Sequence, residues 1–285
     1  MKKLFGGINL TWTKLIILAI LSGIYTAVVS MVPGLLYTSF HTIAVTFEVW
    51  IFFGIFIIMN SKSNKDSALK CFVFFLISQP LVYLIQDVIT GSNLFRTYYF
   101  NWFIWTILCI PMGYIGYYMK KDKWWGYIIL LPMILMDAEM YSAYLSDFMF
   151  SYPKYILITI FCGATLIIYP LYIFNNKKIK TVGVTISTLL IIVFTIYNIV
   201  NPPIYKTQIM ASNEEHQLDD TYKAYLTDSK YGDIEIIYDS NLEEYMLEAS
   251  FKKEGKTNLI IESPNKEKQE FTIDIKRDTY DINKK

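Results

Sequence analysis

The chain has 285 residues, of which 54% are hydrophobic and 17% aromatic, and its formal net charge is only +1. This average hides two unlike regions. Residues 1–200 carry 14 Lys/Arg and seven acids, whereas residues 201–285 carry 12 Lys/Arg and 18 acids. A basic membrane region followed by an acidic soluble tail is therefore predicted, without a nucleic-acid partner.

The cysteine and histidine positions exclude two common kinds of site. Cys71, Cys109 and Cys162 all lie in apolar runs, where a cysteine usually acts as a small hydrophobic residue, so no structural disulfide is expected. His41 and His216 lie in different regions, which argues against a histidine-based zinc site in the membrane. We predict no metal and no cofactor.

Seven apolar runs have the length of about 20 residues that a helix needs to cross a hydrocarbon core of roughly 30 Å. The predicted fold is an all-α polytopic membrane bundle over residues 1–203, with the lipid bilayer as its partner. The predicted transmembrane helices cover residues 14–34, 39–60, 69–90, 100–119, 124–146, 154–174 and 181–200.

Positive charges gather at alternate ends of these helices. Twelve lysines flank one side, and the alternate loops carry only Arg96 and Lys154. The positive-inside rule then places the N-terminus in the cytoplasm and, after seven spans, the tail outside the cell membrane. We expect the first helix to stay uncleaved; cleavage at the weak site Val28-Val29-Ser30 is the alternative. The twelve lysines are Lys2, Lys3, Lys14, Lys62, Lys65, Lys70, Lys120, Lys121, Lys123, Lys177, Lys178 and Lys180.

Residues 204–285 are predicted to form a small extracytoplasmic all-β domain, similar to a sandwich. Apolar and polar residues alternate there, as in Tyr245, Leu247, Ala249 and Phe251, which is typical of half-buried strands. Glu254-Gly255 is predicted to be a hairpin turn, and Pro264-Asn265 marks the next turn. The predicted strands cover residues 221–227, 233–239, 243–252, 256–263 and 269–277.

The most unusual residue of the membrane region is Glu48, because it lies well inside the apolar run 39–60. An acid there is costly unless it is paired, protonated or in contact with water. Glu48 lies about eight residues from the outer surface, or ~12 Å. His41 precedes it by seven residues on the same helical face. The two residues are expected to line one groove that opens outward.

Further polar residues are predicted in the outer half of the bundle. Gln79, Tyr83 and Gln86 share one helical face, and Asp137 shares a face of the fifth helix with Tyr141 and Tyr144. Two interpretations fit: these groups form a polar ligand-binding pocket, or Glu48 pairs with Gln79 or nearby hydroxyls and serves helix packing. A solvated or interfacial position is favoured for Asp137 and for Glu139.

Small and aromatic residues have structural interpretations. Ala19, Gly23 and Ala27 form a small-residue face, which favours close helix packing within the bundle or, alternatively, against another membrane subunit. Trp102 and Trp105 are expected to anchor the fourth helix at the membrane interface, and not to form a ligand cage.

Two stretches carry a family resemblance. The run from Glu48 to Gln86, together with PMGYIGYYMKKDKWWG at residues 111–126, resembles an uncharacterised family of multi-pass membrane proteins from Clostridia-type bacteria. The resemblance covers residues 10–175. The family has no established activity, so the resemblance implies a multi-pass architecture and assigns no residue a role.

Three functions remain open at this point. The first is binding or transport of a small molecule through the outward-facing pocket. The second is a non-enzymatic anchor or regulatory subunit that presents the β domain to partners. The third is an intramembrane enzyme, which is disfavoured because the chain has no Gly-x-Ser-x-Gly element and no His-Glu-x-x-His motif.

Overall fold

The structure is a computed structural model that describes residues 5–209, 218–239 and 243–284. Lys2, Lys3 and His216 lie outside these ranges. The chain divides into two compact units. The first comprises Met1–Tyr144 and Lys154–Thr195, and the second comprises Leu145–Pro153 and Ile196–Lys285.

The first unit is a helical bundle. Six of the described helices are long and apolar enough to span a membrane, and a bent helix pair makes a seventh if it counts as one span. The helices are α1 (Trp12–Met31), α2 (Ser39–Val45), α3 (Phe47–Met59), α4 (Asn64–Thr90), α5 (Leu94–Gly116), α6 (Trp124–Phe150), α7 (Ile156–Ile173) and α8 (Lys177–Val200), with short 3₁₀ turns at Pro33–Leu35 and Tyr117–Lys121.

The helix ends follow from local side chains. The Ser63 hydroxyl accepts the N–H of Asp66 at 3.1 Å and begins α4. Gly91 ends the same helix with φ +67°, a conformation that glycine adopts at little cost. The carboxylate of Asp87 accepts the N–H groups of Leu94 at 2.7 Å and Phe95 at 2.9 Å, and so satisfies free donors at the start of α5.

The prediction of one continuous helix over residues 39–60 is wrong. The chain is extended at Thr46, with φ −85° and ψ 155°, and α2 and α3 meet there at a 52° bend. Proline does not cause this break. Four of the five residues 42–46 are β-branched, which lowers helix propensity. The break places residues 41 and 48 on different helices, so they no longer share one continuous helical face.

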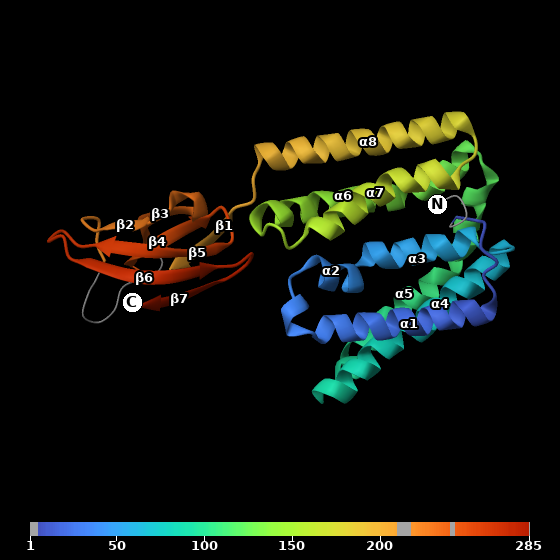
Figure 1. The fold of residues 1–285 in the computed structure, drawn as a ribbon, viewed down its shortest axis with the longest axis horizontal. Coiled ribbons are helices and arrows are strands. Elements are labelled where there is room, and N and C mark those ends of the chain that lie inside the picture. Colours follow the sequence, from blue (N-terminus) through green and yellow to red (C-terminus); the bar gives the residue numbers. More distant parts are fainter. Residues whose placement is uncertain (1–4, 210–217, 240–242, 285) are drawn as a thin grey trace. The chain divides into compact units, whose positions relative to one another are not determined.

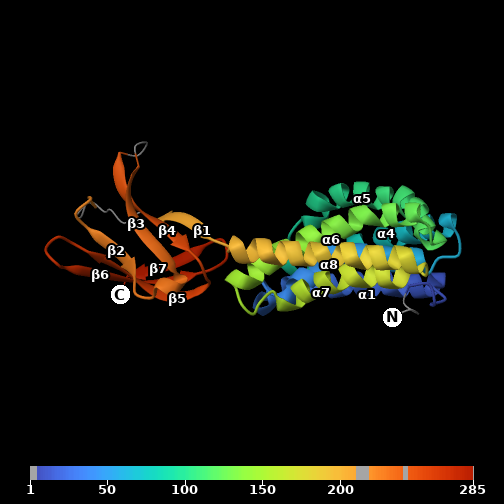
Figure 2. The same ribbon diagram turned by 90° about the horizontal axis from the view of Figure 1, so that it is seen from above.

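The short α3 lies inside the bundle. Figure 1 shows α2 and α3 between α1, α4 and α5 on one side and α6, α7 and α8 on the other. α4 packs against both α1 and α5, and both views show α5 beside α4 (Figures 1 and 2). Apolar side chains of α3 such as Ile55 and Ile57 are fully buried in the core. Glu48, the one ionisable side chain of α3, is also buried.

The small-residue face of α1 packs against α4 of the same chain. Ala19 and Ala27 are fully buried, and a Cβ atom at Gly23 would lie 2.7 Å from the carbonyl oxygen of Ser78. We expect Gly23→Ala to lower the free energy of unfolding by about 1–3 kcal/mol, because the helices must separate. Thermal unfolding of the purified protein measures this effect.

Gly54→Ala on α3 is the matched control. A Cβ atom at Gly54 meets nothing within 4 Å, so this variant should be neutral or up to about 1 kcal/mol more stable, as helix propensity dictates. Equal losses in the two variants would contradict the close α1–α4 contact.

The second unit contains two antiparallel sheets, with strand orders β1-β4-β3 and β2-β5-β6-β7. Leu247, Ala249 and Phe251 of one sheet and Ile273 and Ile275 of the other are buried in one core, as their alternation predicts. The strands are β1 (Tyr205–Ile209), β2 (Lys223–Leu226), β3 (Gly232–Asp239), β4 (Glu244–Phe251), β5 (Gly255–Glu262), β6 (Lys268–Ile275) and β7 (Tyr280–Lys284), with a 3₁₀ turn at Ser229–Tyr231.

The predicted hairpin at Glu254-Gly255 is wrong, whereas the turn at Pro264-Asn265 joins the paired strands β5 and β6. β4 and β5 belong to different sheets, so Glu254-Gly255 connects the sheets. Gly255 has φ +144°, and a Cβ atom there would lie 2.6 Å from the Tyr231 ring. Glycine is required there because the chain passes close to this ring.

The end of α6 belongs to the core of the second unit. The Phe150 side chain is fully buried among the β-strand residues, and its carbonyl oxygen accepts the N–H of Glu254 at 3.0 Å. Asp147 accepts a hydrogen bond from Arg277 Nε at 2.7 Å, and the guanidinium carbon lies 5.3 Å from the centre of the Phe150 ring. The second unit is therefore built from two separate chain segments.

Candidate functional site

The break between α2 and α3 places Glu48 in the protein interior. Glu48 lies in the first turn of α3 and is only 5% exposed. The Tyr144 hydroxyl of α6 donates a hydrogen bond to Glu48 Oε2 at 3.2 Å. A negative charge near a helix N-terminus is favoured by the helix dipole. Glu48 therefore lies where the dipole of α3 and the Tyr144 hydroxyl both favour an acceptor.

A second buried acid, Asp137, lies on α6. Its side chain is 4% exposed, which differs from the solvated position expected for it, whereas Glu139 on the same helix is exposed. The Thr165 hydroxyl of α7 donates to Asp137 Oδ2 at 2.5 Å. Asp137 Oδ1 forms no hydrogen bond of good geometry among the described residues, although the Cys162 thiol, a weak donor, lies near this carboxyl group. A buried carboxylate oxygen without a strong hydrogen bond is costly and signals a missing ligand or proton.

Glu48 and Asp137 lie close enough for their charges to interact. Cys162 and Tyr169 of α7 lie within the electrostatic reach of both acids. Two negative charges in a poorly solvated interior repel each other strongly. The pair therefore favours one added positive charge, which can be a proton, a monovalent cation or the cationic group of a ligand. We call Glu48, Asp137, Tyr144 and Thr165 the acid cluster.

The acid cluster does not have the composition of a divalent-metal site. Within the part of the chain that the structure describes, no group of three or more His, Cys, Asp or Glu side chains could hold a metal ion. Ca²⁺ takes about six to eight oxygen ligands, and Mg²⁺ keeps several waters beside one or two carboxylates. Two carboxylates with hydroxyl neighbours suit a single positive charge better.

The other predicted site residues lie apart from the acid cluster. His41 is half-buried on α2, on the far side of the break at Thr46. Gln86 Nε2 donates to the Ser30 hydroxyl of α1 at 2.6 Å. The Tyr83 ring stacks on Tyr98 of α5, with 6.2 Å between the ring centres.

Gln79 differs from these residues because it lines a cavity between α3, α4 and α5. It is 4% exposed, and its Nε2 atom has no partner among the described residues. The predicted hydrogen bond between Glu48 and Gln79 is therefore not formed. Glu48 instead pairs with a nearby hydroxyl, that of Tyr144, which was the alternative. The predicted residues thus divide among separate places in the bundle.

Comparisons of the chain with protein-family models, with curated proteins and with solved structures find no match. The resemblance to a family of multi-pass membrane proteins stays a prediction.

Helical periodicity predicts that Asp137 and Tyr144 share one face, but it does not predict their neighbours on α7. Thr165 and Cys162 are three residues apart on the face of α7 that meets α6. A hydroxyl and a thiol in an apolar helix are too common to indicate a site by themselves. The signal comes only from their contact with Asp137.

Proposed function

We propose that the chain is a multi-pass cell-membrane protein that binds or transports a small molecule or ion carrying one positive charge, with Glu48 and Asp137 as its ligands. One observation carries this proposal. Two acids from different helices are buried together beside a helix break, and Asp137 Oδ1 forms no hydrogen bond of good geometry among the described residues. Ionisable groups inside a membrane bundle usually mark ion or substrate pathways, and broken helices often form such sites.

A thermal-unfolding titration of the purified protein tests this proposal. Na⁺, Li⁺, K⁺ and methylammonium chlorides are compared at equal ionic strength with a bulky cation such as N-methyl-D-glucamine. A cation that binds the folded state should raise the unfolding temperature by a few degrees at ten times its dissociation constant. A second series measures the unfolding temperature as a function of pH and tests whether the added positive charge is a proton. An unfolding temperature that changes with neither cation nor pH would contradict the proposal.

The proposed topology has seven spans, with the α2–α3 pair as one, the N-terminus in the cytoplasm and the second unit outside. The alternation of lysine-rich and lysine-poor loops supports it. It also directs α3 from the outer side inward, so that the acid cluster is reached from outside. In a variant whose three native cysteines are replaced by alanine, Tyr238→Cys should react with a membrane-impermeant maleimide in intact cells, because position 238 is 55% exposed. Labelling only after lysis would overturn this topology.

One observation favours a second function, that of an anchor or regulatory subunit. α6 carries Asp137 in the first unit and Phe150 in the core of the second unit. A partner that binds the β strands could thus act on the helix that carries an acid. Under this alternative, Phe150→Ala abolishes binding of the partner to the second unit, whereas Glu48→Gln leaves this binding unchanged.

A further inference from the structure

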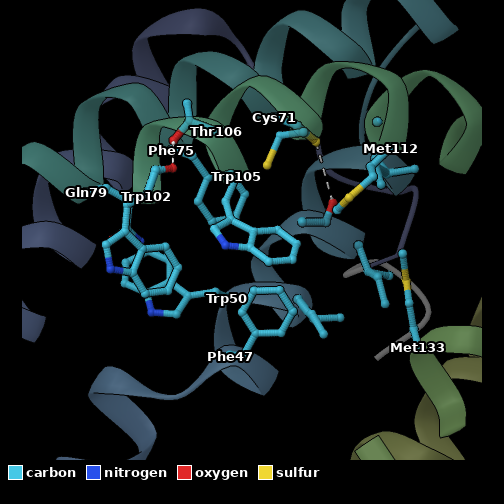
Figure 3. A pocket seen from close by; sticks show the side chains of 16 residues that line it. Phe47, Trp50, Cys71, Phe75, Gln79, Trp102, Trp105, Thr106, Met112 and Met133 are labelled. Atoms are coloured by element: carbon cyan, nitrogen blue, oxygen red, sulfur yellow. Dashed lines mark hydrogen bonds between the residues drawn. The ribbon is translucent and has the colours of Figure 1, made fainter. Parts of the chain in front are cut away.

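The cavity that Gln79 lines is distinct from the acid cluster. It lies between α3, α4 and α5 and measures about 70 Å³. Figure 3 shows aromatic rings gathered at one end of it, whereas Met112 and Met133 lie at the other end. Five aromatic side chains line it: Phe47 and Trp50 from α3, Phe75 from α4, and Trp102 and Trp105 from α5. Its lining is otherwise mostly apolar and contains no acid.

The rim of this cavity lies on the outer face of the bundle. Trp105 is 50% exposed and Met112 is 41% exposed, and both belong to α5, a helix long and apolar enough to span a membrane. An exposed side chain in the middle of such a helix faces lipid. A ligand therefore reaches the cavity sideways from the hydrocarbon, so it is soluble in lipid.

The amide of Gln79 selects the chemistry of this ligand. Gln79 lines the cavity, and its Nε2 atom is a buried hydrogen-bond donor with no partner among the described residues. A rotation of the amide toward the cavity would let a ligand with an acceptor oxygen satisfy this donor. Gln79 lies 15 residues after the start of α4 and 11 residues before its end, or ~22 Å and ~16 Å along the helix axis. This mid-membrane depth excludes the ester carbonyl groups of phospholipids, which lie near the interface.

The aromatic lining selects the shape of the ligand. Rings that surround a narrow space pack best against a flat ring in stacked or edge-on contact. A cavity of about 70 Å³ holds the inner part of such a ring, and the rest of the ligand extends past Trp105 into lipid. We propose that this cavity binds a lipid-soluble molecule of the quinone class, whose ring carbonyl accepts a hydrogen bond from Gln79 Nε2.

Two matched probes test this assignment in lipid nanodiscs. Tetramethyl-1,4-benzoquinone has the proposed flat ring and carbonyl groups, whereas 1,2,4,5-tetramethylbenzene is a flat ring of similar size with the same four methyl groups and no carbonyl. The four methyl groups of the quinone block addition of the thiols of Cys71 and Cys109, which also line the cavity. Affinity is measured from the rise in unfolding temperature with free ligand concentration.

The unmodified protein should bind the quinone at least ten-fold more tightly than the hydrocarbon. Gln79→Leu should bring the affinity for the quinone down to that for the hydrocarbon and leave the latter unchanged. Gln86→Leu is the control, because the Gln86 amide bonds to Ser30 outside the cavity. Equal affinity of the unmodified protein for the two probes would overturn the proposal, even if Gln79→Leu failed to fold. A quinone preference that survives in folded Gln79→Leu would also overturn it.

Discussion

Glu48→Gln should leave the bundle folded and raise the dissociation constant of the proposed cation at least ten-fold. The glutamine amide retains an acceptor for the Tyr144 hydroxyl, which donates to Glu48 at 3.2 Å, but it removes one of the two negative charges. Asp137→Asn should have the same effect, because it removes the other charge and keeps an acceptor for Thr165. Both variants also relieve charge repulsion, so neither should be much less stable than the unmodified protein.

The measurement is the unfolding temperature of each variant over a cation titration at constant ionic strength. Glu139→Gln is the matched control, because Glu139 is an exposed acid two residues from Asp137 on the same helix. This control should respond like the unmodified protein. If Glu48→Gln and Asp137→Asn both respond like Glu139→Gln, the acid cluster serves packing and binds no cation.

Glu48→Leu separates the charge from the hydrogen bond. Leucine removes the acceptor of the Tyr144 hydroxyl, and an unpaired buried hydroxyl costs about 1–3 kcal/mol. Glu48→Leu should thus be less stable than Glu48→Gln, although both lose the cation response. Equal stability of these two variants would indicate that the bond from Tyr144 contributes little to the fold.

Phe150→Ala should destabilise the second unit, called the β unit below, by about 3–5 kcal/mol, the usual range for removing a buried aromatic ring. The Phe150 side chain is fully buried in that core, and its ring lies 5.3 Å from the guanidinium carbon of Arg277. Limited proteolysis in increasing urea measures the effect, because the basic residues of the strands become accessible to trypsin as the unit opens.

Tyr152→Ala is the control for this experiment. Tyr152 lies two residues away and is 65% exposed. Its ring contacts that of Phe148 edge-on, so its replacement should cost at most about 1.5 kcal/mol, well below the loss expected for Phe150→Ala. A β unit that resists proteolysis equally in both variants would show that the end of α6 contributes nothing to its core.

Hydropathy was sufficient to predict most of the helical part of this fold. The ends of α4, α6 and α8 lie within a few residues of the predicted spans, because an apolar run of about 20 residues is typical of a membrane-spanning helix. The break at Thr46 was not predictable in the same way, since proline and glycine do not mark it. β1 and β7 were missed because each has five residues, only two of them apolar or aromatic, so their hydrophobic pattern is weak.

The candidate site was predictable only in part. Glu48 is unusual in the sequence because it is an acid in an apolar run, and the structure shows that its side chain is buried. Its relation to Asp137 depends on contacts between residues 89 positions apart, which helical periodicity does not reveal. The cavity beside Gln79 was missed for a related reason: Trp102 and Trp105 were interpreted one by one as interface anchors, whereas they line one space together with α3.

The participation of residues 145–153 in the β unit has a consequence for the order of assembly. The strands follow α6 by more than 50 residues in the chain, yet their core includes the Phe150 side chain. A fragment that begins at residue 204 lacks this side chain, so it should expose apolar surface and aggregate when expressed alone. In the full chain the β unit can complete its fold only after α6 has been synthesised and α7 and α8 have brought the strands back to its end. The second unit should therefore be the last part of the chain to complete its fold.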